Sequence, residues 1–458
     1  MDILTSMPAF GGFVFVWTIF FFVIALSVIV AIHEYGHYIV GRWSGIHADV
    51  FSIGFGPVLY RRKDKRGTYW QIAALPFGGF VKFAGDADAS SGKDVDAMAD
   101  AAKDPVKLRQ TMHGAPLWAR TVTVAAGPIF NFVFSVIIFT LLGYSNGIPR
   151  DPLIIGNLPA LPVEFQELQE GDLIISINGV LLPKIGSTFN DSFLNELPKK
   201  PVLDYTVNRN GTEVIARGPY LQPALIGAVS PKSAALAAGL LPGDVVMAVN
   251  DQPIFSFTQL KSAVEGSDGK SLDLSVWRDG LLTEKILTPR KVDVPQSEGG
   301  FTSQWRIGVA SANAFEAATE APDLSMAITD GVIQTWSIIS GSISGLRHII
   351  TGAISPCNLS GPVSIAQVSG TMASQGALPF ITWIAILSTA VGLMNLFPIP
   401  ALDGGHLVFY AYEGVTGRPP SDRALRVLMG FGFVFIISLM VFAFGNDVYC
   451  LIISKWFT

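Results

Sequence analysis

The feature that most constrains this chain is an apolar run that leads directly into a metal-binding sequence. Residues 13–32 are apolar and uncharged, and residues 33–37 read His-Glu-Tyr-Gly-His. On a helix, His33 and His37 lie four residues apart on one face, where both imidazoles can bind one zinc ion. Glu34 lies beside them, placed to polarise a water molecule. The run is long enough to cross a bilayer, where each charge costs about 2.5–3.5 kcal/mol, so these ionisable groups indicate a function.

The composition is that of a membrane protein, with 50% hydrophobic and only 15% charged residues. Four stretches without Lys, Arg, Asp or Glu are each long enough to cross a hydrocarbon core of about 30 Å: residues 13–32, 121–144, 376–402 and 427–445. The first stretch lacks the basic start and the cleavage site of a signal peptide, so we expect it to be retained. The sequence predicts a polytopic α-helical membrane protein with four transmembrane helices.

Basic residues predict the orientation of these helices. None precedes the first stretch, whereas many lie in residues 41–117, with a dense block at 61–66, and three arginines lie between the last two stretches. The positive-inside rule places both connections in the cytoplasm and the N-terminus outside. The long segment between the second and third stretches then faces outward. The net charge of −5 and the absence of a basic stripe argue against nucleic-acid binding.

The outward-facing segment contains an internal repeat. Residues 171–179 recur in similar form at 243–251, and residues 203–211 recur at 272–280. Repeats at nearly constant spacing indicate two copies of one small domain. Alternating strands and Asn-Gly or Asp-Gly turns predict hairpins in each copy.

Both copies resemble PDZ domains, which are small α/β domains that capture an extended peptide at a sheet edge. The resemblance is clearer in the second copy, where residues 229–240 read VSPKSAALAAGL before the Gly-Asp turn. The first copy has Leu-Pro-Ala-Leu-Pro at 158–162 instead, so its groove is less well indicated. The alternative is that both copies are structural covers that bind nothing tightly.

The first cytoplasmic connection contains two apolar, strand-like stretches. Residues 51–60 and 68–83 flank the basic block and predict a β-hairpin over residues 49–83. Because the hairpin is so apolar, we expect it to re-enter the membrane beside a cavity, with a sheet edge near His33. Residues 84–107 are rich in Ala, Asp, Ser and Lys and predict a mobile linker.

A catalytic zinc ion usually takes three protein ligands and a water molecule, so a third ligand is needed. Residues 395–406 read Asn-Leu-Phe-Pro-Ile-Pro-Ala-Leu-Asp-Gly-Gly-His, and Asp403 is the only acidic residue in 376–412. A carboxylate at membrane depth indicates a functional site, and the prolines and glycines around it allow a broken helix. On spacing alone, His406 is the alternative ligand.

Two outward-facing features have more than one interpretation. Cys357 and Cys450 could be oxidised there, but we favour two unrelated buried thiols because no disulfide framework is evident. Residues 324–350 are amphipathic and predict a helix that either lies on the outer membrane face or packs against other helices.

Taken together, these motifs resemble the site-2 protease family of intramembrane zinc metalloproteases. The first span ends in H-E-x-x-H, the third carries N-x-x-P-x-P-x-L-D-G, and PDZ-like repeats lie between spans. The second span also has Gly-Pro-Ile-Phe-Asn at 127–131, and residues 359–366 fit the same family. The resemblance covers nearly the whole chain. It implies a zinc metalloendopeptidase that cuts peptide bonds within the membrane.

The resemblance also implies roles for individual residues. Zn²⁺ would be bound by His33, His37 and Asp403 rather than His406, and Glu34 would be the catalytic base. The re-entrant hairpin would pair with an extended substrate strand. Substrate contacts are implied for residues in the third span and in the hairpin: Asn395, Pro398, Gly54, Phe55 and Gly56.

The implied substrates are single-span membrane proteins of the anti-sigma-factor type and remnant signal peptides. They would be cut after an upstream site-1-type protease has removed their external domain, as in regulated intramembrane proteolysis and envelope stress signalling. The implied location is the bacterial inner membrane, with periplasmic PDZ domains and an active site toward the cytoplasm.

Two other classes are weaker. A zinc transporter would need neither Glu34 nor peptide-binding repeats, and an inactive PDZ scaffold would not need the complete ligand set. The predicted organisation is therefore: residues 1–48 first transmembrane helix, 49–83 hairpin, 84–117 cytoplasmic linker, 118–145 second transmembrane helix, 146–220 and 221–310 PDZ-like domains, 311–375 external helix and loop, 376–412 third transmembrane helix, and 413–458 fourth transmembrane helix and tail.

Overall fold

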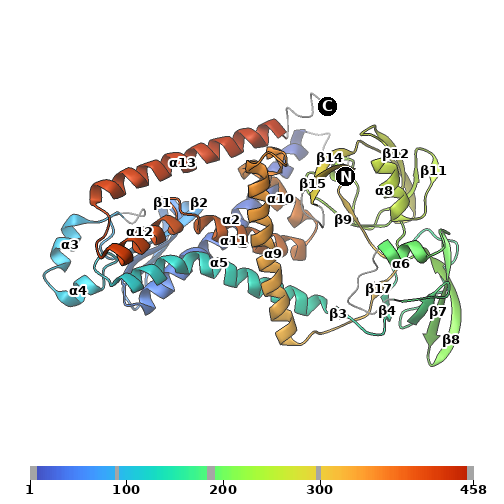
Figure 1. The fold of residues 1–458 in the computed structure, drawn as a ribbon, viewed down its shortest axis with the longest axis horizontal. Helices are drawn as coiled ribbons and strands as arrows, with labels where there is room; N and C mark the ends of the chain where they lie inside the picture. Colours follow the sequence, from blue (N-terminus) through green and yellow to red (C-terminus); the bar gives the residue numbers. More distant parts are fainter. Residues whose placement is uncertain (1–7, 88–91, 183–190, 296–300, 451–458) are drawn as a thin grey trace. The chain divides into compact units, whose positions relative to one another are not determined.

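A computed structural model describes residues 8–87, 92–182, 191–295 and 301–450 (Figure 1). The chain divides into two compact units. One is built mainly from Gly143–Leu324, and the other from Gly11–Leu142 together with Ser325–Thr458. The second unit contains the long apolar helices, and the first contains the repeats.

Among the described residues, four helices are long and apolar enough to cross a membrane, which agrees with the four predicted spans. They are α2 (Pro8–Trp43), α5 (Leu117–Asn146), α11 (Ala377–Asn395) and α13 (Asp422–Val448). Helix α2 continues past the apolar run to Trp43, and Gly45 then takes a left-handed conformation (φ 81°) that ends it. The tail beyond residue 450, predicted as part of the last segment, lies outside the described residues.

The third predicted span is broken where its prolines lie. Helix α11 ends at Asn395, and a second helix, α12 (Asp403–Thr416), begins at Asp403. Pro400 cannot continue a helical hydrogen-bond ladder. Gly404 packs so tightly on the carbonyls of Leu396 and Phe397 that a Cβ would not fit. The predicted broken helix is confirmed, and its first part is shorter than the predicted stretch.

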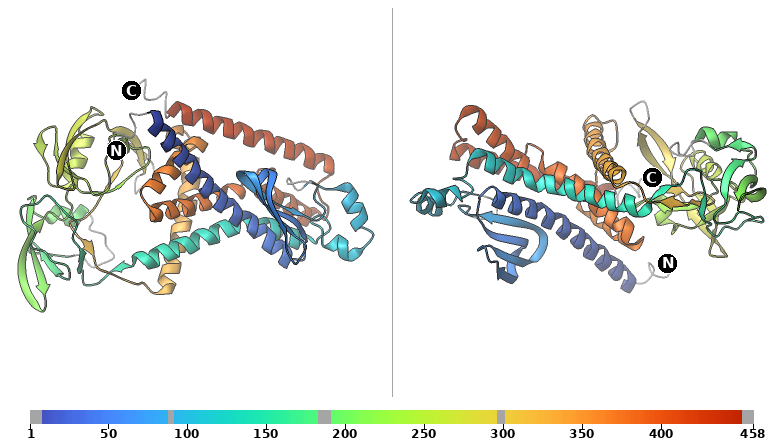
Figure 2. Two further views of the ribbon diagram at one scale, coloured as in Figure 1. Left: turned by 180° about the vertical axis from the view of Figure 1, so that it is seen from behind. Right: turned by 90° about the horizontal axis from the view of Figure 1, so that it is seen from below.

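The predicted hairpin interval forms two long antiparallel strands, β1 (Ala48–Lys63) and β2 (Tyr69–Phe83) (Figure 2). Each strand doubles back at glycines with positive φ, such as Gly54 and Gly78. Phe51 therefore pairs with Val81 on one side and with Trp70 on the other. The result is a sheet in four rows rather than a simple hairpin.

The segment predicted to be only a linker contains two short helices. They are α3 (Val95–Ala101) and α4 (Pro105–Arg109). Asp94 and Asp104 each precede a helix and accept hydrogen bonds from its first free backbone N–H groups. The acidic residues that suggested a polar linker act locally as helix caps.

The unit built mainly from Gly143–Leu324 contains two four-stranded sheets with the same strand order. The first sheet follows the order β6-β5-β7-β8, and the second follows β11-β10-β12-β13. Their strands are β5 (Leu173–Ile177), β6 (Val180–Leu181), β7 (Val202–Arg209), β8 (Thr212–Pro219), β10 (Val245–Val249), β11 (Gln252–Pro253), β12 (Leu272–Arg278) and β13 (Leu281–Leu287).

An equivalent ion pair between a partly exposed arginine and a buried aspartate occurs in each copy. Arg209 at the end of β7 pairs with Asp172 at 2.7 Å, and Arg278 at the end of β12 pairs with Asp244 at 2.6 Å. Each copy has its own apolar core. Short helices complete them: α6 (Asp191–Glu196), α7 (Ala234–Ala237) and α8 (Phe257–Glu265).

Residues after the second copy return to pair with both copies, which differs from the predicted boundary at residue 310. After the hairpin β14 (Arg290–Pro295) and β15 (Phe301–Arg306), three short strands pair with earlier ones. They are β16 (Val309–Ser311) with β9 (Ile226–Val229), β17 (Glu316–Ala317) with β4 (Ile155–Asn157), and β18 (Thr319–Glu320) with β3 (Ile148–Pro149). An unpaired strand leaves backbone groups unsatisfied, so the returning chain covers these edges.

The amphipathic segment forms α9 (Leu324–Ile350), and α9 packs against α5. A Cβ at Gly331 would lie 2.5 Å from Thr140 Oγ1 and 2.8 Å from the Val136 carbonyl oxygen. Helix α9 thus meets a membrane helix through small residues and still exposes large apolar ones such as Trp336. This contact supports the packing-helix interpretation.

The expectation of two unrelated thiols is wrong, because Cys357 and Cys450 form a disulfide. Cys357 lies in the short helix η1 (Pro356–Asn358), before α10 (Pro362–Ser374), and Cys450 follows α13. Beside the disulfide, the Asp447 carboxylate accepts hydrogen bonds from the backbone N–H groups of Gly361 and Ser364 at 3.0 and 2.9 Å. Tertiary packing brings the cysteines together from 93 residues apart, and their spacing gave no hint of it.

Candidate metal centre

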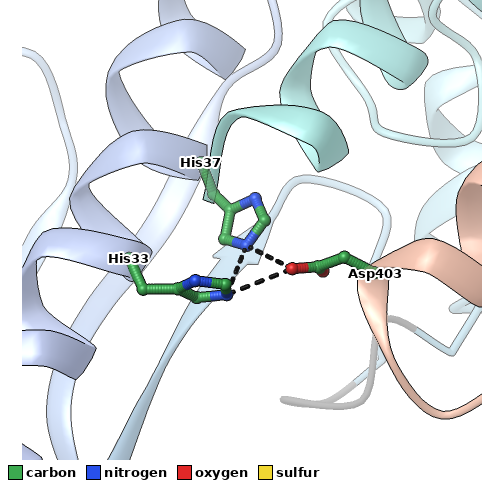
Figure 3. A group of neighbouring side chains, drawn as sticks. All are labelled: His33, His37 and Asp403. Atoms are coloured by element: carbon green, nitrogen blue, oxygen red, sulfur yellow. Dashed lines mark hydrogen bonds and ion pairs between the residues drawn. The ribbon is translucent and has the colours of Figure 1, made fainter. Parts of the chain in front are cut away.

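Helix α2 carries two of the predicted ligands one turn apart. His33 Nε2 and His37 Nε2 lie 3.2 Å apart (Figure 3), and only 11% and 12% of their side chains are exposed. Gly36, between them, allows α5 to approach closely: a Cβ there would lie 2.6 Å from the Ala126 carbonyl oxygen and 2.9 Å from Phe130 Cβ. Close approach through small residues is a common way of packing membrane helices. It places both imidazoles against α5.

Asp403, the first residue of α12, completes the cluster. Its Oδ2 lies 3.1 Å from His33 Nε2 and 3.4 Å from His37 Nε2. Figure 3 shows the three side chains converging, two from α2 and one from α12. Within the part of the chain that the structure describes, these three form the one group suited to holding a metal ion. His406, the alternative on spacing, is not a member of that group.

The cluster fits a zinc ion in tetrahedral coordination. Ligand atoms about 2.0–2.1 Å from a tetrahedral zinc are about 3.3–3.4 Å from one another, close to the observed 3.1–3.4 Å. Asp403 Oδ2 is buried and has no hydrogen-bond partner among the described residues. Gly127 keeps the space open, because a Cβ there would lie 2.5 Å from His37 Cε1 and 2.8 Å from His33 Cε1. Three ligands leave a fourth position for water.

Helix α5 holds the far nitrogen of each imidazole. His37 Nδ1 lies 2.9 Å from the carbonyl oxygen of Thr123, which can only accept a hydrogen bond. Nδ1 of His37 therefore carries the proton, and Nε2 is left to bind a metal. His33 Nδ1 lies 3.2 Å from the side-chain amide of Asn131, which is fully buried.

The β1–β2 sheet holds Glu34. A Cβ at Gly79 would lie 3.2 Å from Glu34 Cγ. Among the described strands, residues 79–83 pair only with residues 48–53. The other edge of this row is unpaired among the described strands, and the row itself packs against Glu34 at Gly79.

A comparison with protein families identifies the class of protein that carries this cluster. The model of "Peptidase family M50" matches residues 21–439. The chain belongs to peptidase family M50. It is therefore a zinc metalloendopeptidase of the membrane, which confirms the enzyme class and the resemblance drawn from the motifs.

Similar proteins agree with this M50 membership. A protein of Agrobacterium fabrum whose name contains the words zinc metalloprotease is 33% identical over 434 residues, covering 94% of this chain and 95% of that protein. The regulator of sigma-E protease of Escherichia coli is 30% identical over 461 residues, covering 94% and 98%. Its namesake in Salmonella typhimurium is 30% identical over 459 residues, also covering 94% and 98%.

The remaining predicted residues of the M50 peptidase lie outside the group of three. Asn395 is the half-buried last residue of α11, and Pro398 is exposed in the segment that follows. Gly54 and Gly56 have φ angles of 91° and 83° in the bend of β1. Phe55, between them, stacks on Phe80 with ring centroids 5.9 Å apart. Their contacts with substrate stay predictions.

Sequence reasoning gave no role to three residues that build the M50 site: Thr123, Gly127 and Asn131. Gly127 and Asn131 are the ends of the Gly-Pro-Ile-Phe-Asn sequence that supported the family resemblance. A polar side chain at Asn131, within a membrane span, was the available signal. Thr123 acts through its backbone oxygen, which no residue type reveals.

Proposed function

We propose that this M50 peptidase hydrolyses peptide bonds inside the transmembrane segments of single-span membrane proteins of the anti-sigma-factor type and of remnant signal peptides. Its location would be the bacterial inner membrane, with the active site toward the cytoplasm. The observation that carries the proposal is the His33, His37 and Asp403 cluster, built from membrane-spanning α2 and from α12 beside it. Relatives named regulator of sigma-E protease support this substrate class.

Proton transfer is assigned to Glu34. Its carboxylate lies next to His33 on α2, accepts the proton of the attacking water, and returns it to the leaving amine nitrogen. A zinc ion held by the three ligands supplies Lewis acidity to the water and to the scissile carbonyl. Asn395, at the end of the helix that leads to Asp403, is assigned to the substrate backbone.

The sheet provides a reason for a β-element beside these helices. A transmembrane helix hides its peptide bonds behind i→i−4 hydrogen bonds, so a substrate must unwind before it is cut. The free edge of residues 79–83 can replace those lost bonds by strand addition. Because Gly79 in this row packs against Glu34, an added strand would run past the catalytic carboxylate.

The two repeats are assigned as periplasmic PDZ-like domains that admit substrates only after an upstream site-1-type protease has removed their external part. A cavity of about 450 Å³ in the second copy supports peptide binding there. It lies between α8 and β15, and Leu260, Val264 and Trp305 are among its lining residues. The cavity thus lies in the copy whose sequence resembles PDZ domains more clearly.

Cleavage of a model single-span substrate, with and without its external domain, tests the proposal. Since Ile148 and Glu320 pair as neighbouring strand residues, residues 150–318 can be replaced by a short Gly/Ser linker without separating the ends. We expect wild type to cut only the truncated substrate and the deletion variant to cut both. Equal cleavage of the intact substrate by both enzymes would eliminate the filter, and cleavage of neither substrate by wild type would eliminate the proposed substrate class.

A further inference from the structure

Asn131 has an unusual environment for a buried amide. Its side chain is 0% exposed, and its Nδ2 lies 3.2 Å from His33 Nδ1. Its Oδ1 is buried and has no hydrogen-bond partner among the described residues. The orientation of an amide is interchangeable by a half-turn, which exchanges its oxygen and nitrogen positions.

The position of His33 decides between the two orientations. Its Nε2 faces His37 Nε2 at 3.2 Å and Asp403 Oδ2 at 3.1 Å, so Nε2 is the metal-facing nitrogen. A neutral imidazole that binds a metal through Nε2 carries its proton on Nδ1 and needs an acceptor there. An NH₂ group at that place is a second donor, whereas a carbonyl oxygen accepts.

As placed, the amide leaves Oδ1 without a hydrogen-bond partner among the described residues, so the contact with His33 settles the choice. We propose that Asn131 presents Oδ1 to His33 and accepts the hydrogen bond of Nδ1–H, and that Asn131 is the positioning residue for this zinc ligand. The inference rests on the proposed zinc ligation by His33. Thr123 performs the same task for His37 through its backbone oxygen, at 2.9 Å.

The role of the Asn131 side chain can be tested separately from helix packing, because the interhelical hydrogen bonds at this position use the Asn131 backbone. Ser135 Oγ and Ser388 Oγ each donate to the Asn131 carbonyl oxygen at 3.0 Å. These bonds connect α5 with itself and with α11, and they remain when the side chain is replaced. Variants at position 131 therefore keep the contacts that hold the helices together.

Zinc affinity of the full-length protein, purified in detergent and measured by competition with a chromogenic chelator, tests the inference. We expect Asn131→Ala to weaken zinc binding about 10–100-fold, the usual effect of losing such a partner. We expect Asn131→Asp to keep wild-type affinity or exceed it, because a carboxylate also accepts from Nδ1–H. If the amide instead donated to His33, Asn131→Asp would lose as much as Asn131→Ala.

Ser135→Ala is the matched control, because it removes a buried hydroxyl from the same helix one turn away and does not touch His33. Its zinc affinity should equal that of wild type. Unchanged affinity in Asn131→Ala, loss in Asn131→Asp, or an equal loss in Ser135→Ala would each overturn the inference. If the inference fails but wild type binds zinc and Asp403→Ala does not, the proposed function still stands. If wild type itself binds no zinc, the proposed function is overturned as well.

Discussion

At the scale of single residues, the metal centre depends on a missing side chain at position 127. Helix α5 passes so close to the imidazoles that the Cβ of an alanine at Gly127 would lie 2.5 Å from His37 Cε1. Real Cβ atoms do not come so close, so either His37 or the helix must shift. A ring displaced by an ångström no longer points its nitrogen at a shared ion.

We therefore expect Gly127→Ala to lose bound zinc and with it nearly all cleavage. Zinc content by atomic spectroscopy and cleavage of the truncated substrate measure both effects. Gly143→Ala is the control on the same helix, since a Cβ there meets nothing within 4 Å. Full zinc occupancy in Gly127→Ala would contradict the close approach of α5 to the site.

The role of Glu34 can be tested separately from metal binding by a substitution that preserves the shape of its side chain. Glu34→Gln keeps the size of the side chain but removes the proton acceptor, so we expect zinc to stay bound and cleavage to fall at least about 100-fold. The same zinc and cleavage measurements apply. Turnover near the wild-type rate in Glu34→Gln would remove Glu34 from the mechanism.

At the scale of elements, the helix that presents Asp403 needs an anchor of its own. Non-helical segments precede and follow α12, and Gly404 and Gly405 are its only buried residues among those described. Further along, Glu413 pairs with Arg120 on α5 through two bonds of 2.6 and 3.0 Å, and both side chains are only about 15% exposed. This pair ties α12, which carries Asp403, to α5, which packs against His33 and His37.

Breaking the pair should loosen zinc as well as the fold. Removing one partner of a buried ion pair costs about 3 kcal/mol or more, because the other charge is left unpaired. We expect Arg120→Met to lower thermal stability and zinc affinity together, and Arg120→Glu with Glu413→Arg to recover part of both. Lys103→Met, which breaks an exposed pair with Asp100, is the control and should change neither. Normal zinc affinity in Arg120→Met would confine the pair to a structural role.

The elements show where sequence reasoning succeeds and where it stops. Apolar runs located the four membrane helices, and the prolines before Asp403 located the break between α11 and α12, because both are local properties of the chain. The sequence predicted a simple hairpin where β1 and β2 form a sheet in four rows. The extra rows depend on bends at Gly54 and Gly78, which a period-2 pattern does not reveal.

The site divides in the same way. His33, Glu34 and His37 follow from helical spacing, and the cost of a lone carboxylate at membrane depth indicates Asp403. The family resemblance was needed to prefer Asp403 to His406. Asn131 needed the packing of α5 against α2 before a role could be assigned. Contacts between distant segments, and contacts made by backbone atoms, have no signature in residue type.

At the scale of the whole molecule, two independent arguments predict the same orientation in the membrane. The basic block around Lys65 favours the cytoplasmic side for the β1–β2 turn. The disulfide between Cys357 and Cys450 favours an oxidising compartment for the loop before α10 and the end of α13. In a chain with four spans, the connection after the first span and the end of the fourth span lie on opposite sides of the membrane, so the two arguments agree.

Thiol labelling in sealed, right-side-out vesicles of the inner membrane checks this orientation. We expect a membrane-impermeant maleimide to label wild-type protein only after reduction, because Cys357 and Cys450 are bonded and would face outward in this orientation. With both cysteines changed to serine and Lys65→Cys added, labelling should require the vesicles to be opened. Label on Lys65→Cys in sealed vesicles, with none on the reduced pair, would reverse the orientation and move the repeats to the cytoplasm. The proposed periplasmic filter would then fail, while the metal centre and its three ligands would be unaffected.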